Sequence, residues 1–148
     1  MAQLHLDGSV TFIYSNDFEA SLNFYGNVLG LEVAGSIGDD VRVFSLPGAY
    51  LGVVKQGVSA ASRPPRCAAE NGDTCIVGLL CPSAAQVDAL HARLQAAASR
   101  GLGAVDAAPA RNDAFGIYNA IARDPSGYIV EVMAFLKPDF LKPPRARL

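Results

Sequence analysis

The feature that most constrains the fold of this chain is a pattern of secondary structure that occurs twice in 148 residues. Residues 9–15 and residues 74–81 are both rich in β-favouring types and predict two equivalent strands. Each strand is followed by a helix N-cap residue, Asp17 in the first copy and Ser83 in the second. The two caps lie 66 positions apart. An internal duplication explains this spacing, and accidental symmetry within one α+β domain is the alternative.

Within each copy, a helix and three short strands follow the first strand. In the first copy, Phe18, Leu22, Tyr25 and Leu29 recur at helical spacing before Gly30, which is a natural helix stop. The second helix begins at Ser83 and is expected to end at Gly101. The expected strands are 31–37, 41–46 and 50–55 in the first copy, and a weak one near 104–107, then 116–123 and 128–135, in the second.

We therefore predict an α+β fold, built as tandem βαβββ modules within a single domain that spans residues 1–148. A patternless stretch rich in Gly, Ser, Pro and Arg separates the copies and is expected to be an exposed linker. The predicted parts are module one at about 9–55, the linker at 56–73, module two at about 74–135, and a C-terminal arm at 136–148.

The composition limits which classes of partner the protein can bind and indicates its cellular compartment. The net charge of −2 and the pI of about 5.6 disfavour nucleic acid, which requires a basic surface. No apolar stretch reaches membrane-spanning length, and no basic start precedes an apolar run. The three cysteines form no CxxC motif, and we expect them to be reduced thiols: Cys67, Cys75 and Cys81. We expect a cytoplasmic protein that binds neither nucleic acid nor membrane.

Two segments of the sequence carry a family resemblance. The first contains Phe24-Tyr25 and then Leu29-Gly30-Leu31, and the second reads Asp124-Pro125-x-Gly127-x-x-x-Glu131. Both resemble motifs of the vicinal oxygen chelate superfamily, which includes glyoxalase I, bleomycin-resistance proteins, fosfomycin-resistance enzymes and extradiol dioxygenases. The resemblance covers residues 9–135. It implies that each module curls its sheet into a cupped mixed surface, and that two modules face each other around a cavity.

The resemblance also implies where a metal would be held. In metal-binding members the ligands come from the first and last strands of the modules, which here are Val10, Ile76, either Gly52 or Val53, and Glu131. Only Glu131 has a donor side chain, and both histidines of the chain fall elsewhere. A divalent metal needs three or four protein donors. We therefore predict no metal and no other cofactor.

Alternation along the strands predicts what surrounds Glu131. If its side chain points into the cup, then those of Ile129 and Met133 do too, while Val130 and Val132 pack against the helices. The same phase places Ile13, Val77 and Leu79 against the helices and Gly78 in the cup. The predicted ligand-binding residues are Val10, Phe12, Tyr14, Ile76, Leu80, Tyr118, Ile129, Glu131 and Met133.

Such a surface suits a small, mostly apolar organic ligand held by a few polar groups. The first hypothesis is a homodimer that sequesters an antibiotic or aromatic metabolite without metal. The alternatives are a glyoxalase-like lyase, isomerase or dioxygenase with non-standard metal ligands, or a metal-free catalyst with Glu131 as base and Tyr14 or Tyr118 as proton donor. Glu131 could also be structural, bonded to Tyr14, Tyr118 or Asn119, with the cup covered by a partner chain. Arg111-Asn112-Asp113 is expected to form a loop.

Overall fold

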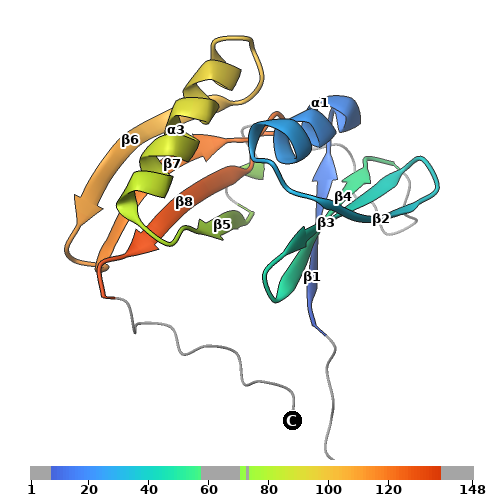
Figure 1. The fold of residues 1–148 in the computed structure, drawn as a ribbon. Helices are drawn as coiled ribbons and strands as arrows, with labels where there is room; N and C mark the ends of the chain where they lie inside the picture. Colours follow the sequence, from blue (N-terminus) through green and yellow to red (C-terminus); the bar gives the residue numbers. More distant parts are fainter. Residues whose placement is uncertain (1–7, 58–70, 73, 138–148) are drawn as a thin grey trace, which may run out of the picture.

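The protein consists of two four-stranded sheets, and helical elements cover one side of each sheet (Figure 1). The computed structural model describes residues 8–57, 71–72 and 74–137. The first sheet contains β1 (Val10–Ser15), β2 (Val33–Ile37), β3 (Val41–Leu46) and β4 (Ala49–Lys55), and the second contains β5 (Ile76–Leu80), β6 (Ala104–Asn112), β7 (Ile117–Arg123) and β8 (Ile129–Phe135). The helical elements are α1 (Phe18–Asn23), the π-helical η1 (Phe24–Val28) and α3 (Ala84–Ala98).

The predicted α+β duplication is confirmed by the connectivity of the two sheets. Their strand orders are β1-β4-β3-β2 and β5-β8-β7-β6, so corresponding strands occupy corresponding places. In each sheet the first strand pairs in parallel with the last one, and the other pairs are antiparallel. β1 begins at Val10 and β5 at Ile76, which preserves the offset of 66 positions.

Helix caps fix where both helices begin. The Asp17 carboxylate accepts a hydrogen bond from the backbone N–H of Ala20 at 3.0 Å, and the Ser83 hydroxyl accepts one from Gln86 at 3.3 Å. Gly30 follows the first helical run with a φ of 72°, which favours glycine. The π-helical turn of η1 was not predicted. None of the helices in the described segments is long and apolar enough to cross a membrane.

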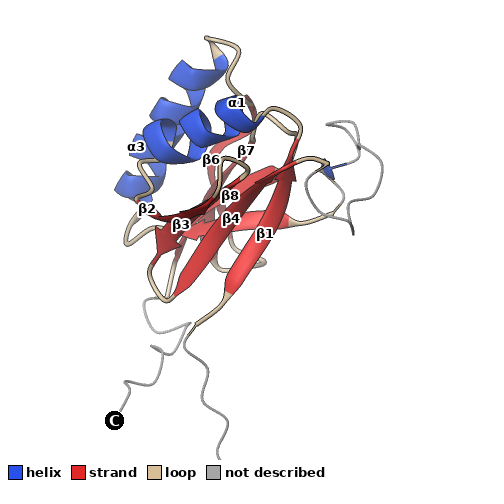
Figure 2. Ribbon diagram, turned by 90° about the vertical axis from the view of Figure 1, so that its right-hand side faces the viewer, coloured by secondary structure: helices blue, strands red, loops and turns tan. Residues whose placement is uncertain are grey.

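The core lies between the sheets and the helices, which cover one side of the strands (Figure 2). Val130 and Val132 on β8 are fully buried, and Ile13 on β1 is nearly so. Phe24 and Tyr25 meet edge to face, with 5.2 Å between ring centroids. Burying each such side chain stabilises the fold by about 1.5–3 kcal/mol. The predicted helix-facing phase is therefore confirmed for Ile13, Val77, Leu79, Val130 and Val132.

Strand β6 is longer than the sequence indicated, and it corrects the expectation of a loop at Arg111 and Asn112, whereas Asp113 lies in the turn that follows the strand. It runs for nine residues, and Arg111 pairs with Tyr118 of β7. β6 is the edge strand of its sheet, and its register shifts on both sides of Ala107. An edge strand with bulges tolerates Pro109, a residue that argues against a strand in the middle of a sheet.

The expected linker and arm fall largely outside the described residues, as do Cys67 and His5. At the end of the linker, however, Asn71 and Gly72 are buried, which corrects the expectation of exposure. The Asn71 side chain donates a hydrogen bond of 2.6 Å to the backbone carbonyl of Ser126. At the start of the arm, the N–H of Leu136 bonds to the carbonyl of Gly116 at 2.9 Å.

Candidate functional site

The sides of the two sheets that face away from the helices carry exposed apolar side chains. We call this the open face and define it by Val10, Phe12, Tyr14, Ile76, Leu80, Ile129, Glu131 and Met133. Within the second sheet, strand pairing supports the grouping, because Ile76 lies beside Ile129 and Leu80 beside Met133. Val10 and Phe12 are 43% and 47% exposed, and Ile76 and Leu80 are 58% and 57% exposed. Large apolar side chains exposed on neighbouring strands make each of these sheet sides a candidate binding surface.

On the first sheet, the ring of Phe12 takes the place of a side chain at residue 52. Phe12 of β1 lies beside Gly52 of β4 in the parallel ladder. A Cβ at Gly52 would overlap the Phe12 ring, so the ring lies directly across the glycine backbone. Val53, the other position considered for a ligand, is completely buried on the helix side. The first module therefore offers an aromatic ring at one of the positions where the family resemblance implies a metal ligand.

On the second sheet, Glu131 is half-buried and is oriented by a neighbouring strand. Asn119 of β7 donates a hydrogen bond of 2.7 Å from its Nδ2 to Oε1 of Glu131. This is one of the three partners that the sequence suggested. No other described residue bonds to the Glu131 carboxylate, so Oε2 can accept a hydrogen bond from a ligand.

The structure does not bring Tyr118 to the open face. In the β7–β8 ladder it lies beside Ala134, in the phase that faces the helices. Its hydroxyl donates a hydrogen bond of 2.8 Å to Asp88 on α3. This bond favours the protonated phenol and raises the pKa of Tyr118. Tyr14 does lie in the open-face phase, and its backbone N–H bonds to the Tyr128 hydroxyl at 3.3 Å.

The residues at the expected ligand positions do not fit a metal centre. Val10 and Ile76 have no donor atoms, and Gly52 has no side chain. Within residues 8–57, 71–72 and 74–137, no three His, Cys, Asp or Glu side chains gather in a way that could hold an ion. His91 is buried on α3, on the helix side of the second sheet, and its Nδ1 has no partner among the described residues.

The two sequence motifs that carry the family resemblance contact each other inside the protein. The hydroxyl of Tyr25, from η1, donates a hydrogen bond of 2.7 Å to Oδ2 of Asp124. The other carboxylate oxygen of Asp124 accepts the backbone N–H groups of Ser126 and Tyr128, both at 2.9 Å. Burial raises the pKa of Asp124, and the Tyr25 bond opposes that rise. The motifs therefore join the modules, a contact that sequence reasoning missed because it spans 99 positions.

A second polar group continues this junction between the modules. The Ser126 hydroxyl accepts a hydrogen bond of 3.0 Å from the backbone N–H of Asn16. Ser15 and Ser21, both from the first module, are buried, with 2.6 Å between their hydroxyl oxygens. All of these groups are satisfied within the protein, so we assign them to structure rather than to ligand binding.

The protein is an α+β fold of two βαβββ units, each with one open sheet face. Comparison with known proteins shows which family has this fold. The profile of the Glyoxalase/Bleomycin resistance protein/Dioxygenase superfamily matches residues 5–132, and the chain belongs to this family. No curated protein matches the sequence.

Solved structures agree with this assignment. A glyoxalase/bleomycin resistance protein/dioxygenase from Nocardioides is 23% identical, with coverage of 99% of this chain and 93% of that one and a TM-score of 0.65. A lactoylglutathione lyase from Agrobacterium tumefaciens is 25% identical, with coverage of 85% and 91% and a TM-score of 0.63. A family member from Burkholderia phytofirmans is 17% identical, with coverage of 86% and 97% and a TM-score of 0.67.

Proposed function

We propose that this protein binds a small, mostly apolar organic molecule on its open face without a metal, in the manner of a sequestering protein. The observation that carries the proposal is the Phe12 ring lying over Gly52, where metal-binding relatives would place a ligand. An aromatic ring in that position can stack on a flat ligand. An antibiotic or an aromatic metabolite has the required chemistry.

Glu131 would supply the polar anchor of this site. Asn119 holds one carboxylate oxygen and leaves the other for a hydroxyl or cation of the ligand. Pockets for organic ligands commonly combine an apolar lining with a few placed polar groups of this kind. The proposed contacts are Val10, Phe12, Tyr14, Ile76, Leu80, Ile129, Glu131 and Met133.

We further propose that the working form is a homodimer. Ile76 and Leu80 are more than half exposed, and a second copy covering them would convert an open apolar surface into an enclosed one. The net charge of −2 and the apolar face favour an organic ligand over nucleic acid or membrane as partner. A cytoplasmic location agrees with the free thiols of Cys75 and Cys81.

Thermal unfolding with a panel of hydrophobic antibiotics and aromatic metabolites tests the proposal. A ligand selective for the folded protein raises the unfolding temperature as its concentration exceeds its Kd. Phe12→Ala should abolish that rise. Phe115→Ala is the matched control, because Phe115 is 72% exposed in the turn between β6 and β7 and is not one of the residues that define the open face. No rise across the panel, or an equal loss in both variants, would contradict the proposal.

An enzymatic role is the second candidate, favoured by the free oxygen of Glu131 and by the similarity to a lactoylglutathione lyase. Glu131 would act as a general base, or would bind a metal together with non-standard ligands in a lyase, isomerase or dioxygenase. Metal analysis of protein purified without chelator separates these versions. Stoichiometric zinc, nickel, manganese or iron would favour the metal enzyme over sequestration.

A further inference from the structure

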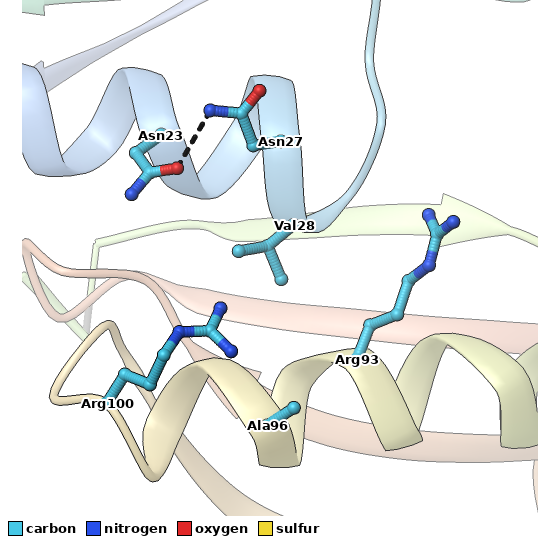
Figure 3. A pocket seen from close by; sticks show the side chains of 6 residues that line it. All are labelled: Asn23, Asn27, Val28, Arg93, Ala96 and Arg100. Atoms are coloured by element: carbon cyan, nitrogen blue, oxygen red, sulfur yellow. Dashed lines mark hydrogen bonds between the residues drawn. The ribbon is translucent and has the colours of Figure 1, made fainter.

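A surface groove lies between the helical elements of the two modules, on the helix side and away from the open face. It encloses about 260 Å³ and is lined by Asn23, Asn27, Val28, Arg93, Ala96 and Arg100. α1 and η1 provide one wall and α3, with the turn that follows it, provides the other (Figure 3). This volume is below the range of about 300–1,000 Å³ for drug-sized ligands, so the groove suits a smaller molecule.

Two arginines give the groove its charge. Arg93 and Arg100 are seven positions apart, which places them on one face of the helical run and about 10 Å apart along its axis. Among the described residues, neither guanidinium has an ion pair or a hydrogen bond. No acidic side chain lines the groove. Arg100 follows the C-terminus of α3, but the half charge of a helix end is smaller than that of a full guanidinium.

The centre of the groove is apolar and the wall opposite the arginines carries uncharged amides, whereas the two ends of the groove are positively charged. Ala96 lies between the arginines on α3, and Val28 points toward it from η1 (Figure 3). On the opposite wall, Asn27 donates a hydrogen bond of 2.9 Å to Oδ1 of Asn23, which leaves the Asn23 amide N–H groups free to donate. The groove therefore has positive ends, an apolar middle and neutral donors on one side.

We propose that this groove binds a small organic dianion, such as a dicarboxylate, with one acidic group on each arginine and a short hydrocarbon segment over Ala96 and Val28. Guanidinium groups bind carboxylates through paired hydrogen bonds, and the spacing of the arginines selects for two separated acids. Because its walls come from different modules, a bound dianion would hold the two helical layers together. The site is independent of the open face.

Calorimetric titration and thermal unfolding with glutarate and succinate test this site at fixed ionic strength. Both dicarboxylates should bind saturably and raise the unfolding temperature, whereas butyrate and inorganic phosphate should bind at least about tenfold more weakly. Arg93→Gln and Arg100→Gln should each weaken glutarate binding by about tenfold or more.

Arg111→Gln is the matched control, because this substitution removes the same charge from an exposed side chain on β6, outside the groove. It should leave glutarate binding unchanged, as should Phe12→Ala on the open face. Absence of glutarate binding, equal binding of butyrate or phosphate, or equal weakening by all three arginine variants would overturn the proposal. Circular dichroism of each variant confirms that it is folded before binding is compared.

Discussion

Removal of the Tyr25 hydroxyl should destabilise the protein in a pH-dependent way. In Tyr25→Phe, the buried Asp124 carboxylate loses the 2.7 Å hydrogen bond from the phenol and keeps only its backbone donors. A hydrogen bond to a charged group contributes about 1.5–3 kcal/mol. Because both partners are buried, no water replaces the lost donor, and we expect a loss of about 2–3 kcal/mol near neutral pH.

The pH dependence follows from the raised pKa of Asp124. Burial raises this pKa in the folded state, so ionisation of Asp124 lowers stability as the pH rises through the folded-state pKa. The Tyr25 bond lowers the same pKa, and its removal therefore increases the penalty at neutral pH. Near pH 4, around the ordinary pKa of Asp, more of the carboxyl is protonated in the variant, and the loss should shrink to about 1 kcal/mol.

Urea denaturation of wild type and Tyr25→Phe at about pH 7.5 and pH 4 measures both effects. At neutral pH the loss corresponds to a fall in Tm of about 4–12 °C for a domain of this size. Tyr118→Phe is the matched control, because its hydroxyl bonds to Asp88 at the surface and its removal should leave stability unchanged. Equal losses at both pH values, or equal losses in both variants, would refute the reasoning.

Two further substitutions test the open face. Gly52→Ala should cost about 1–3 kcal/mol in urea denaturation, because the new Cβ overlaps the Phe12 ring. Gly35→Ala on β2 is the matched control, because a Cβ there meets nothing within 4 Å and the φ of Gly35 is not positive. Unchanged stability in Gly52→Ala would contradict the packing. Glu131→Gln keeps an oxygen for the Asn119 bond, so stability should hold while binding of an open-face ligand weakens by about tenfold in calorimetry. Lost stability with intact binding would instead make Glu131 structural.

Much of the fold was predictable because strand and helix signals are local. β3 has the predicted bounds, and Asp17 and Ser83 cap the helices as their sequence positions indicate. β6 was underestimated because Ala-rich sequence and Pro109 give a weak strand signal, and pairing with β7 supplies what the local sequence lacks.

The candidate site was predictable only where the alternation of side chains along a single strand decides which face of the sheet a residue occupies. Glu131 and Phe12 follow directly from the phase of their own strands. Tyr118 was placed among the ligand contacts, yet the register of β7 against β8 turns it toward α3, and a shift of one residue reverses the face of every side chain. The bond between Tyr25 and Asp124 joins distant segments, and no local pattern encodes it.

The close approach of Phe12 to Gly52 makes these two positions mutually dependent during any change of function. A histidine or carboxylate introduced at Gly52 alone would collide with the ring and destabilise the sheet before it could bind an ion. Replacing Phe12 by alanine alone would uncover the Gly52 backbone without adding a donor. A metal ligand at residue 52 therefore requires a simultaneous change at residue 12, and libraries of single substitutions would miss this combination.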